Sequence, residues 1–345
     1  MQQKLPLFKI GIVATILLLA PQVLPYFMDQ TSYYFYLIDL MGIFAIGALG
    51  LGLLIGFAGQ ISIGHAAFMA IGAFFSGYTT LKLGWPFWVA LPCSGLFTGV
   101  FGYALGFPAL RLSGQYLAIA TLGFGVAIPQ VLLKWESVSG GFDGLKPPAP
   151  MLFSYKISQE EDYYYIVLLC LTFMIWLAYN IVHSRTGRAF IALRDSETAA
   201  QAMGVNLAHY KTLAFALSAF YVGIAGSLYA HLVRFIGAGD FHLGMSVNYL
   251  TMIVIGGLTS IPGFVAGAAF ITALPHMINA ASRSFPASMK GIAQNLPQVL
   301  TGLILILVVL YLPRGIVQLW SMVKRKPATE IIATEGVKSS DQASR

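Results

Sequence analysis

Charged residues and cysteines are both scarce in this sequence. Only 10% of its 345 residues are Asp, Glu, Lys or Arg, whereas 57% are hydrophobic, and a soluble globular domain carries about 25% charged residues. Together with a mean hydropathy of +0.76, this indicates a polytopic membrane protein rather than a soluble one. The two cysteines, Cys93 and Cys170, lie inside apolar runs, so we interpret them as small buried hydrophobes, not as a disulfide or metal site.

Motifs for phosphate and metal binding are also missing. The sequence contains no Gly-x-x-x-x-Gly-Lys-Ser/Thr, no Cys-x-x-Cys and no His-Glu-x-x-His. No Ser/His/Asp arrangement occurs in a plausible setting either. We therefore predict no catalytic residue, no metal site and no cofactor in this chain. The net charge of +7 does not indicate nucleic-acid binding, because the basic residues are spread over separate loops.

Apolar runs long enough to cross a bilayer recur along the chain. They predict an all-α polytopic membrane protein of about ten transmembrane helices. A permease domain over 1–320 would then be followed by a disordered cytoplasmic tail, 321–345. The first run could be read as a signal peptide, but Pro21 and Pro25 follow it instead of a cleavage site, so we expect a retained span. The predicted spans are 7–26, 35–57, 61–81, 87–107, 115–133, 163–183, 212–235, 246–258, 263–281 and 294–312.

The distribution of Lys and Arg predicts the orientation. With ten spans and the N-terminus in the cytoplasm, more than half of the 20 basic residues fall on the cytoplasmic side. Most acidic residues fall outside. This bias favours cytoplasmic N- and C-termini, an external loop over 134–162 and a cytoplasmic loop over 184–211.

The cytoplasmic loop, from Ser184 to Lys211, is a polar insert between two apolar runs. Its stretch Glu197 to Met203 consists mainly of Ala, Gln, Glu and Met, which predicts a short helix. Gly204 follows as a natural stop. We interpret this segment as a docking element for another protein.

A second motif interrupts an apolar run at residues 56–68, GFAGQISIGHAAF. Irregular backbone at membrane depth is tolerated only where protein or a water-filled cavity satisfies it. Gln60, Ser62, Gly64 and His65 are therefore candidates for lining a solute path, and freed amides at a helix start can meet a carboxylate. The alternative is a tight interfacial turn in which His65 caps or pairs between helices.

The external loop contains GGFDGL at residues 140–145. Gly141 and Asp143 are candidates for an outer gate or a partner contact, and a plain structural turn is the alternative. Few ionisable residues lie inside the predicted spans, which counts mildly against an ion-driven carrier. Among them, we expect Asp39 to lie near the outer interface, within reach of water.

Two short segments share the pattern Ala-Gly-polar-apolar-polar-apolar-Gly: Ala58 to Gly64 and Ala238 to Gly244. They are five predicted spans apart, and an odd offset reverses orientation, as in inverted transporter repeats. We take an inverted repeat of five helices as a hypothesis; chance similarity in a glycine-rich chain is the alternative.

These motifs resemble LivM-type permease subunits of ATP-binding-cassette importers for branched-chain amino acids. The resemblance covers about residues 35–319. The matching stretches are GFAGQISIGHAAFMAIGAF, GGFDGL, RTGRAFIALRDSETAAQAMGVN with YKTLAFALSAFYVGIAGSLYA, and GGLTSIPGFVAGAAF.

The resemblance implies an assembly in a bacterial inner membrane. Its partners would be a second homologous permease, two cytoplasmic ATP-binding subunits that hold ATP and Mg, and a periplasmic solute-binding protein. It also implies that residues 194–204 couple the permease to the ATPases, although Thr198 and the missing downstream proline depart from the general importer pattern. The coupling residues we expect are Arg188, Arg194, Asp195, Glu197, Ala200 and Gly204.

Other functions stay open from the sequence. Relatives of this type also carry urea, short amides or other amino acids. A stand-alone secondary carrier or channel is a further alternative, but it would have no need of the segment 185–204. An intramembrane enzyme lacks a nucleophile and base.

Overall fold

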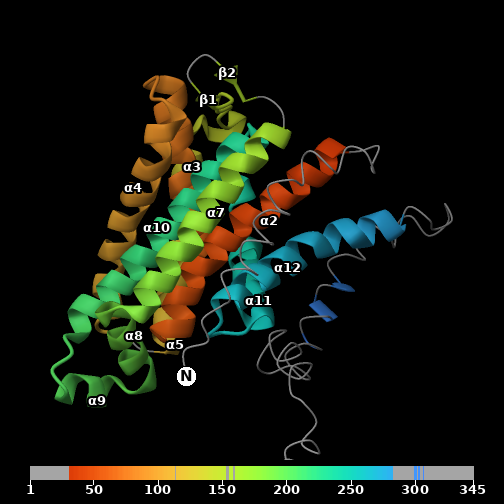
Figure 1. Ribbon diagram of the computed structural model, residues 1–345. Coiled ribbons are helices and arrows are strands. Elements are labelled where there is room, and N and C mark those ends of the chain that lie inside the picture. Colours follow the sequence, from red (N-terminus) through yellow and green to blue (C-terminus); the bar gives the residue numbers. More distant parts are fainter. Residues whose placement is uncertain are drawn as a thin grey trace, which may run out of the picture.

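The computed structural model describes residues 31–112, 114–152, 155–157 and 160–282, together with 299–300, 302–303 and 306 (Figure 1). The predicted span 7–26 and the predicted tail 321–345 lie outside the described residues, as does most of 294–312. The helical elements are α2 (Thr31–Gly52), η2 (Leu53–Phe57), α3 (His65–Lys82), α4 (Phe87–Ala109), α5 (Gln115–Lys134), α6 (Glu136–Ser139), η3 (Gly141–Asp143), α7 (Glu160–His183), α8 (Arg185–Asp195), α9 (Glu197–Ala202), α10 (Leu207–Val233), η4 (Ala238–Asp240), α11 (Leu243–Gly256) and α12 (Ile261–Ser282). Two-residue strands β1 (Met151–Leu152) and β2 (Tyr155–Lys156) pair in antiparallel fashion.

The described part of the chain contains 6 helices that are long and apolar enough to cross a membrane. They are α2 with η2, α4, α5, α7, α10 and α12. The predicted spans 61–81 and 246–258 coincide with α3 and α11, which are helices but do not reach that standard. Helix α11 has 14 residues, fewer than the ~20 that a straight crossing needs. The fold is therefore a helical membrane domain.

Helix α10 lies at the centre of the bundle and packs against α4, α3 and α2. Glycines allow these helices to approach closely. A Cβ at Gly72 of α3 would meet the backbone of Gly223, and one at Gly226 of α10 would meet the Met69 carbonyl. Small residues at such crossings bring backbones into van der Waals contact, the main attraction between helices in lipid.

Helices α5 and α7 lie at the periphery. Only 22% of the apolar window in each is buried, against 72% in α10. Asp39 on α2 is fully buried, so the expectation that water reaches it was wrong. The reason is that α7, α10, α11 and α12 all pack against α2.

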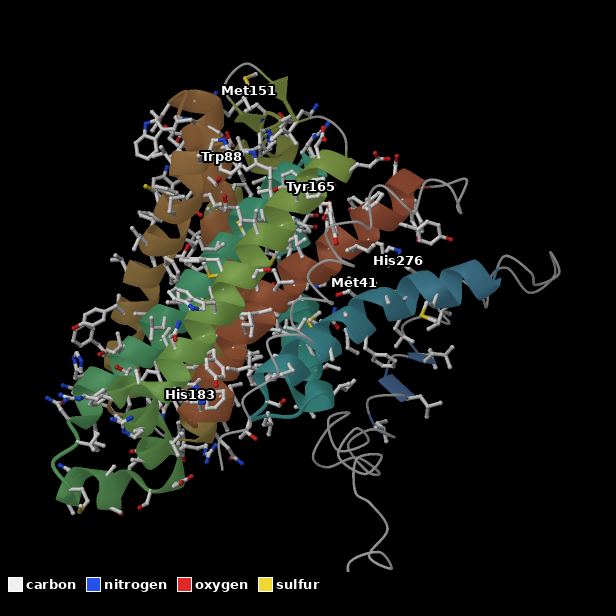
Figure 2. The ribbon with its side chains drawn as sticks, viewed as in Figure 1. Met41, Trp88, Met151, Tyr165, His183 and His276 are labelled. Carbon is white, nitrogen blue, oxygen red and sulfur yellow. The ribbon has the colours of Figure 1, made fainter. Side chains whose placement is uncertain are left out.

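The two ends of the bundle carry different elements (Figure 1). One end holds β1, β2 and the segment around η3, where Trp88 Nε1 donates a 2.9 Å hydrogen bond to the carbonyl oxygen of Met151. The other end holds α8 and α9. Figure 2 shows Trp88 and Met151 together at the first end, and His183 near the opposite end.

Two of the breaks between long helices contain irregular backbone that matters for the site. Helix α2 passes into the π-helix η2, and residues 58–64 are not helical before α3 begins at His65. The second place, residues 234–242, contains the bridge residue Ile236 and the short turn η4 before α11 begins. The starts of α3 and α11 meet, because Ala66 N donates a 2.9 Å hydrogen bond to Ser246 Oγ. The prediction of irregular backbone after residue 56 is confirmed.

Candidate functional site

The polar segment 184–211 folds as two short helices that lead into α10. Each of the three helices begins at a side-chain cap: Ser184 Oγ accepts from Thr186 N at 3.1 Å, Ser196 Oγ accepts from Ala199 N at 3.3 Å, and Asn206 Oδ1 accepts from His209 N at 3.1 Å. Such caps satisfy amides that have no partner within the helix. Gly204 has a φ of +84°, which suits glycine after a helix. The predicted short helix ending before Gly204 is confirmed, and α8 is an additional helix.

One side of this helix pair packs against the bundle. Phe190 is fully buried, and Leu193 and Ala200 are nearly so. A Cβ at Gly187 would meet the carbonyl oxygens of Ile181 and Val182 at the end of α7, so only glycine allows this close approach. Helices α8 and α9 therefore form a fixed part of the bundle.

Arg194 connects α8 to the end of α2. Its Nη1 donates a 3.0 Å hydrogen bond to the carbonyl oxygen of Gly56 in the π-helix, and its Nη2 lies 2.9 Å from Asp195 Oδ1. Gly59, whose φ is +70°, packs directly against Arg194. Arg194 thereby contacts both η2 and the irregular segment that follows it.

Glu197 connects α9 to α10. Its Oε1 lies 2.7 Å from Lys211 Nζ, and the Lys211 side chain is only 4% exposed. Sequence reasoning missed the role of Lys211, although a lysine at the edge of an apolar run was an available signal for a paired charge. Arg194 and Glu197 therefore make contacts within the chain.

The opposite side of α9 is exposed in the part of the chain that the structure describes. Met203 is 84% exposed, and its neighbours on this side are small or polar. Arg188 on α8 is exposed as well. We call the exposed residues of α9 and its end the docking face; they are Thr198, Ala199, Gln201, Ala202 and Met203.

The predicted path residues of the first irregular segment lie inside the bundle. Ser62 and His65 are fully buried and Gln60 is 5% exposed. His65 Nδ1 lies 3.2 Å from Ser62 Oγ, and its Nε2 lies 2.8 Å from Ser218 Oγ on α10. Gly64 is also buried, and a Cβ there would meet the Thr121 carbonyl on α5. These contacts show His65 pairing between α3 and α10.

Gly141 and Asp143 lie at the end of the bundle that carries β1 and β2. Gly140, Gly141 and Gly144 all have positive φ, between +61° and +74°. Asp143 and Phe142 are exposed, and Leu145 pairs with Ile236 through two 2.9 Å backbone hydrogen bonds. Pro147 contacts α3 at Gly77, three turns beyond His65. The structure therefore does not bring Gly141 and Asp143 together with the residues around His65.

In the part of the chain described, no group of three or more His, Cys, Asp or Glu side chains is placed to hold a metal ion. The two cysteines are free thiols.

Comparisons with known proteins identify the family. Residues 33–309 match the family described as "Branched-chain amino acid transport system / permease component". The chain belongs to this family. It is 30% identical over 298 residues to the high-affinity branched-chain amino acid transport system permease protein LivM of Salmonella typhimurium, covering 79% of this chain and 67% of that protein. The LivM protein of Escherichia coli strain K12 matches to the same extent.

A more distant relative serves a different transport system. The autoinducer 2 import system permease protein LsrC of Escherichia coli O9:H4 is 26% identical over 193 residues, which cover 54% of this chain and 52% of LsrC. No solved structure matches the chain. The chain is thus a membrane-embedded transport permease, and its relatives are transport proteins rather than enzymes.

Proposed function

We propose that this chain is the permease subunit of an ATP-driven importer and provides half of the translocation path for branched-chain amino acids. The observation that carries the proposal is the match of residues 33–309 to branched-chain amino acid permeases. The LivM relatives supply the substrate class. ATP and Mg would be held by two cytoplasmic partner subunits. A second homologous permease and a periplasmic solute-binding protein would complete the assembly, with the chain crossing a bacterial inner membrane.

The helix pair α8–α9 supports a coupling role. Its docking face is exposed, while Arg194 and Glu197 hold its other side to η2 and α10. A movement imposed on α9 from outside would therefore reach two membrane helices without an intervening flexible linker. Alternating access then requires only that the ATPases and the solute favour different arrangements of the bundle. In this proposal Arg188 and the docking face meet the ATPase, and Ala200 and Gly204 shape α9.

The irregular segments support a path near the centre of the bundle. The starts of α3 and α11 meet through Ala66 and Ser246, as expected if the two segments are related by an inverted repeat. We assign Gln60, Ser62, Gly64 and His65 to holding the first segment in place beside the path. Gly141 and Asp143 would lie at its outer mouth. The α8–α9 end would face the cytoplasm, with both termini on that side.

The test is reconstitution in vesicles with and without the partners. We expect uptake of leucine, isoleucine or valine only when the second permease, the ATPases, the binding protein and ATP are all present. Uptake by the chain alone, without an ATPase, would show a stand-alone carrier and reject the importer. ATP-dependent uptake of urea or an amide in place of these amino acids would support an ATP-driven importer but would contradict branched-chain amino acids as its substrates.

A further inference from the structure

The segment of residues 145–152 is joined in sequence to peripheral helices but is held by central ones. It follows α5, α6 and η3 and precedes α7 along the chain. Several of its hydrogen bonds, however, reach other parts of the bundle. Leu145 exchanges two 2.9 Å backbone hydrogen bonds with Ile236, just after α10, and the carbonyl oxygen of Met151 accepts one from Trp88 of α4 (Figure 2). The segment is therefore fixed relative to α10 and its neighbour α4.

His231, near the end of α10, supplies a further anchor. Its Nδ1 lies 3.0 Å from the carbonyl oxygen of Pro148, in the middle of the segment. A carbonyl oxygen only accepts hydrogen bonds, which assigns the proton to Nδ1 as the donor. Pro147 and Pro148 have no amide N–H of their own. This part of the segment therefore depends on its carbonyl oxygens, and on donors from other elements, to be fixed.

The other side of the His231 ring is also bonded. Its Nε2 lies 3.1 Å from Ser76 Oγ of α3, and Ser227 Oγ donates a 2.7 Å hydrogen bond to the same oxygen. In the neutral ring Nε2 accepts from Ser76, so the hydrogen bonds run in one direction from Ser227 to Pro148. The ring of Phe87 packs edge-on against the imidazole at 4.8 Å. Both serines are fully buried and His231 is 1% exposed, so a turn of the ring would leave buried polar atoms without partners.

Helix α10 connects this anchor to α9. Its 27 residues span about 40 Å. Near its start, Lys211 pairs with Glu197 of α9 at 2.7 Å, and His231 lies in its last turn. Between these two contacts, Gly223 packs against the backbone of α3 at Gly72. A displacement of α9 would therefore reach residues 145–152 through one continuous, closely packed helix.

We propose that His231 is a positioning residue for transport: it holds residues 145–152 on α10, in the arrangement that receives the periplasmic solute-binding protein. This inference rests on the proposed function. A segment that is already ordered loses less conformational entropy when a partner docks on it. It also moves together with α10 when the ATPases act. Without the hydrogen bond to Pro148, the segment would have to be ordered at each encounter.

Two replacements of His231 separate its two contacts. His231→Asn keeps an amide N–H at the place of Nδ1 and can still donate to Pro148, whereas His231→Gln reaches the place of Nε2 and leaves Pro148 without its donor. In the assembled transporter, we expect His231→Gln to raise the concentration of leucine-loaded binding protein that gives half-maximal uptake. The rise should be about five- to tenfold, the effect of one lost hydrogen bond, with the maximal rate within about twofold of wild type. His231→Asn should restore most of this loss.

Ser227→Ala is the matched control. It removes a buried hydroxyl from the same chain of hydrogen bonds, but one that bonds to Ser76 and not to Pro148. We expect it to leave the half-maximal concentration of binding protein unchanged. Equal rises for His231→Gln and Ser227→Ala would show a general packing role and would overturn the inference, as would a rise for His231→Asn equal to that for His231→Gln.

Thiol labelling measures the position of the segment directly. Ala149 is next to Pro148 and is 7% exposed, whereas Phe142 is 84% exposed. With Cys93 and Cys170 replaced by alanine, Ala149→Cys is labelled by an impermeant thiol reagent in the absence of binding protein. We expect slow labelling with His231 in place and at least about fivefold faster labelling in His231→Gln, because local opening sets the rate. Labelling of Ala149→Cys as fast as that of Phe142→Cys with His231 in place, or no acceleration by His231→Gln, would overturn the inference.

The two proposals fail in different ways. If the wild-type complex shows no ATP-dependent uptake of branched-chain amino acids, the proposed function fails, and labelling of Ala149→Cys still shows whether His231 holds the segment. If the wild type does show that uptake and His231→Gln leaves the half-maximal concentration unchanged, only the positioning role fails. If His231→Gln inserts but does not assemble, the labelling rate of Ala149→Cys in the inserted permease decides.

Discussion

Lys211 carries a positive charge into an almost closed environment, where Glu197 is its 2.7 Å partner. A charge in such a place is tolerated because the partner carboxylate offsets the lost hydration. The Glu197 carboxylate is more accessible, with 38% of its side chain exposed. The two members of the pair therefore differ in burial. Loss of the carboxylate would leave the buried Lys211 ammonium group without its partner and would weaken the contact between α9 and α10.

Glu197→Gln should therefore reduce ATP-dependent uptake several-fold at normal expression. We expect a loss of about 1–2 kcal/mol in the contact between α9 and α10, below the ~3–5 kcal/mol of a fully buried pair, because Glu197 is partly solvated. Uptake per assembled complex in reconstituted vesicles measures the effect. The double variant Glu197→Lys with Lys211→Glu should recover part of the loss.

Asp195→Asn is the matched control for this prediction. Asp195 also pairs with a basic side chain, Arg194, but its own side chain is 63% exposed. Because both members of this pair are partly solvated, we expect Asp195→Asn to lose less uptake than Glu197→Gln. Equal losses for Glu197→Gln and Asp195→Asn would contradict the special role of the buried pair.

Gly64 is a glycine whose replacement tests how tightly α3 packs against α5. An added Cβ would meet the Thr121 carbonyl, so Gly64→Ala should lower the free energy of unfolding by about 1–3 kcal/mol. The midpoint of thermal unfolding in detergent measures this. Gly123→Ala on α5 has open space for its methyl group and should leave the midpoint unchanged. Similar midpoints for the two variants would show that Gly64 is not tightly packed.

Helix α9 illustrates how an element can be fixed on one side and available on the other. Its six residues are too few to be stable alone, so the Ser196 cap, buried Ala200 and the Glu197 ion pair must hold it. Met203, at its end, has no comparable contact and is 84% exposed. An exposed, flexible thioether suits an adaptable protein contact.

Met203→Asp should therefore weaken co-purification of the ATP-binding subunits while the permease inserts normally. A charge at the centre of an apolar contact costs desolvation, and we expect affinity to fall at least about tenfold. Met151→Asp is the matched control, because Met151 is also exposed, at 54%, but lies at the opposite end of the bundle. Undiminished co-purification of Met203→Asp would exclude α9 as the docking element.

Helix positions could largely be predicted because apolar runs and polar breaks are local properties. The predicted start of α5 at Gln115 and the predicted end of α7 at His183 are both observed. Partners across the chain could not be predicted in this way. The contacts of Arg194 with Gly56 and of Ser218 with His65 depend on how α2, α3 and α10 pack. The composition of a local segment does not predict such packing.

The same limit applies to the candidate path. The polar residues after residue 56 interrupt an apolar run, which predicted that they line a solute path. In the fold they are buried against α5 and α10. Helix α11 starts beside the start of α3 because the chain after α10 turns back toward the bundle. That return depends on the Leu145–Ile236 pairing and on Ala66 meeting Ser246, contacts between residues far apart in sequence.

For the molecule as a whole, the two ends have distinct surfaces. The α8–α9 end exposes a capped, partly apolar helix pair, and the β1–β2 end exposes a glycine-rich turn with Phe142 at 84% exposure. Helices α2 and α10 run between them, so each end is connected to the other through continuous packed helices. In an importer, one end would receive the solute and the other the force of ATP binding.

This difference between the two ends predicts the orientation of the protein in the membrane. In a variant free of native cysteines and expressed without the ATP-binding subunits, Gln201→Cys should react with an impermeant thiol reagent only in inside-out vesicles, because we place α9 in the cytoplasm. Phe142→Cys should react only in intact, right-side-out cells or vesicles. Both side chains are exposed, so a missing signal would reflect the side of the membrane and not burial. Labelling of Gln201→Cys from the outside would place α9 on the side of the membrane opposite to the ATPases. That result would reject the proposal of an ATP-driven importer.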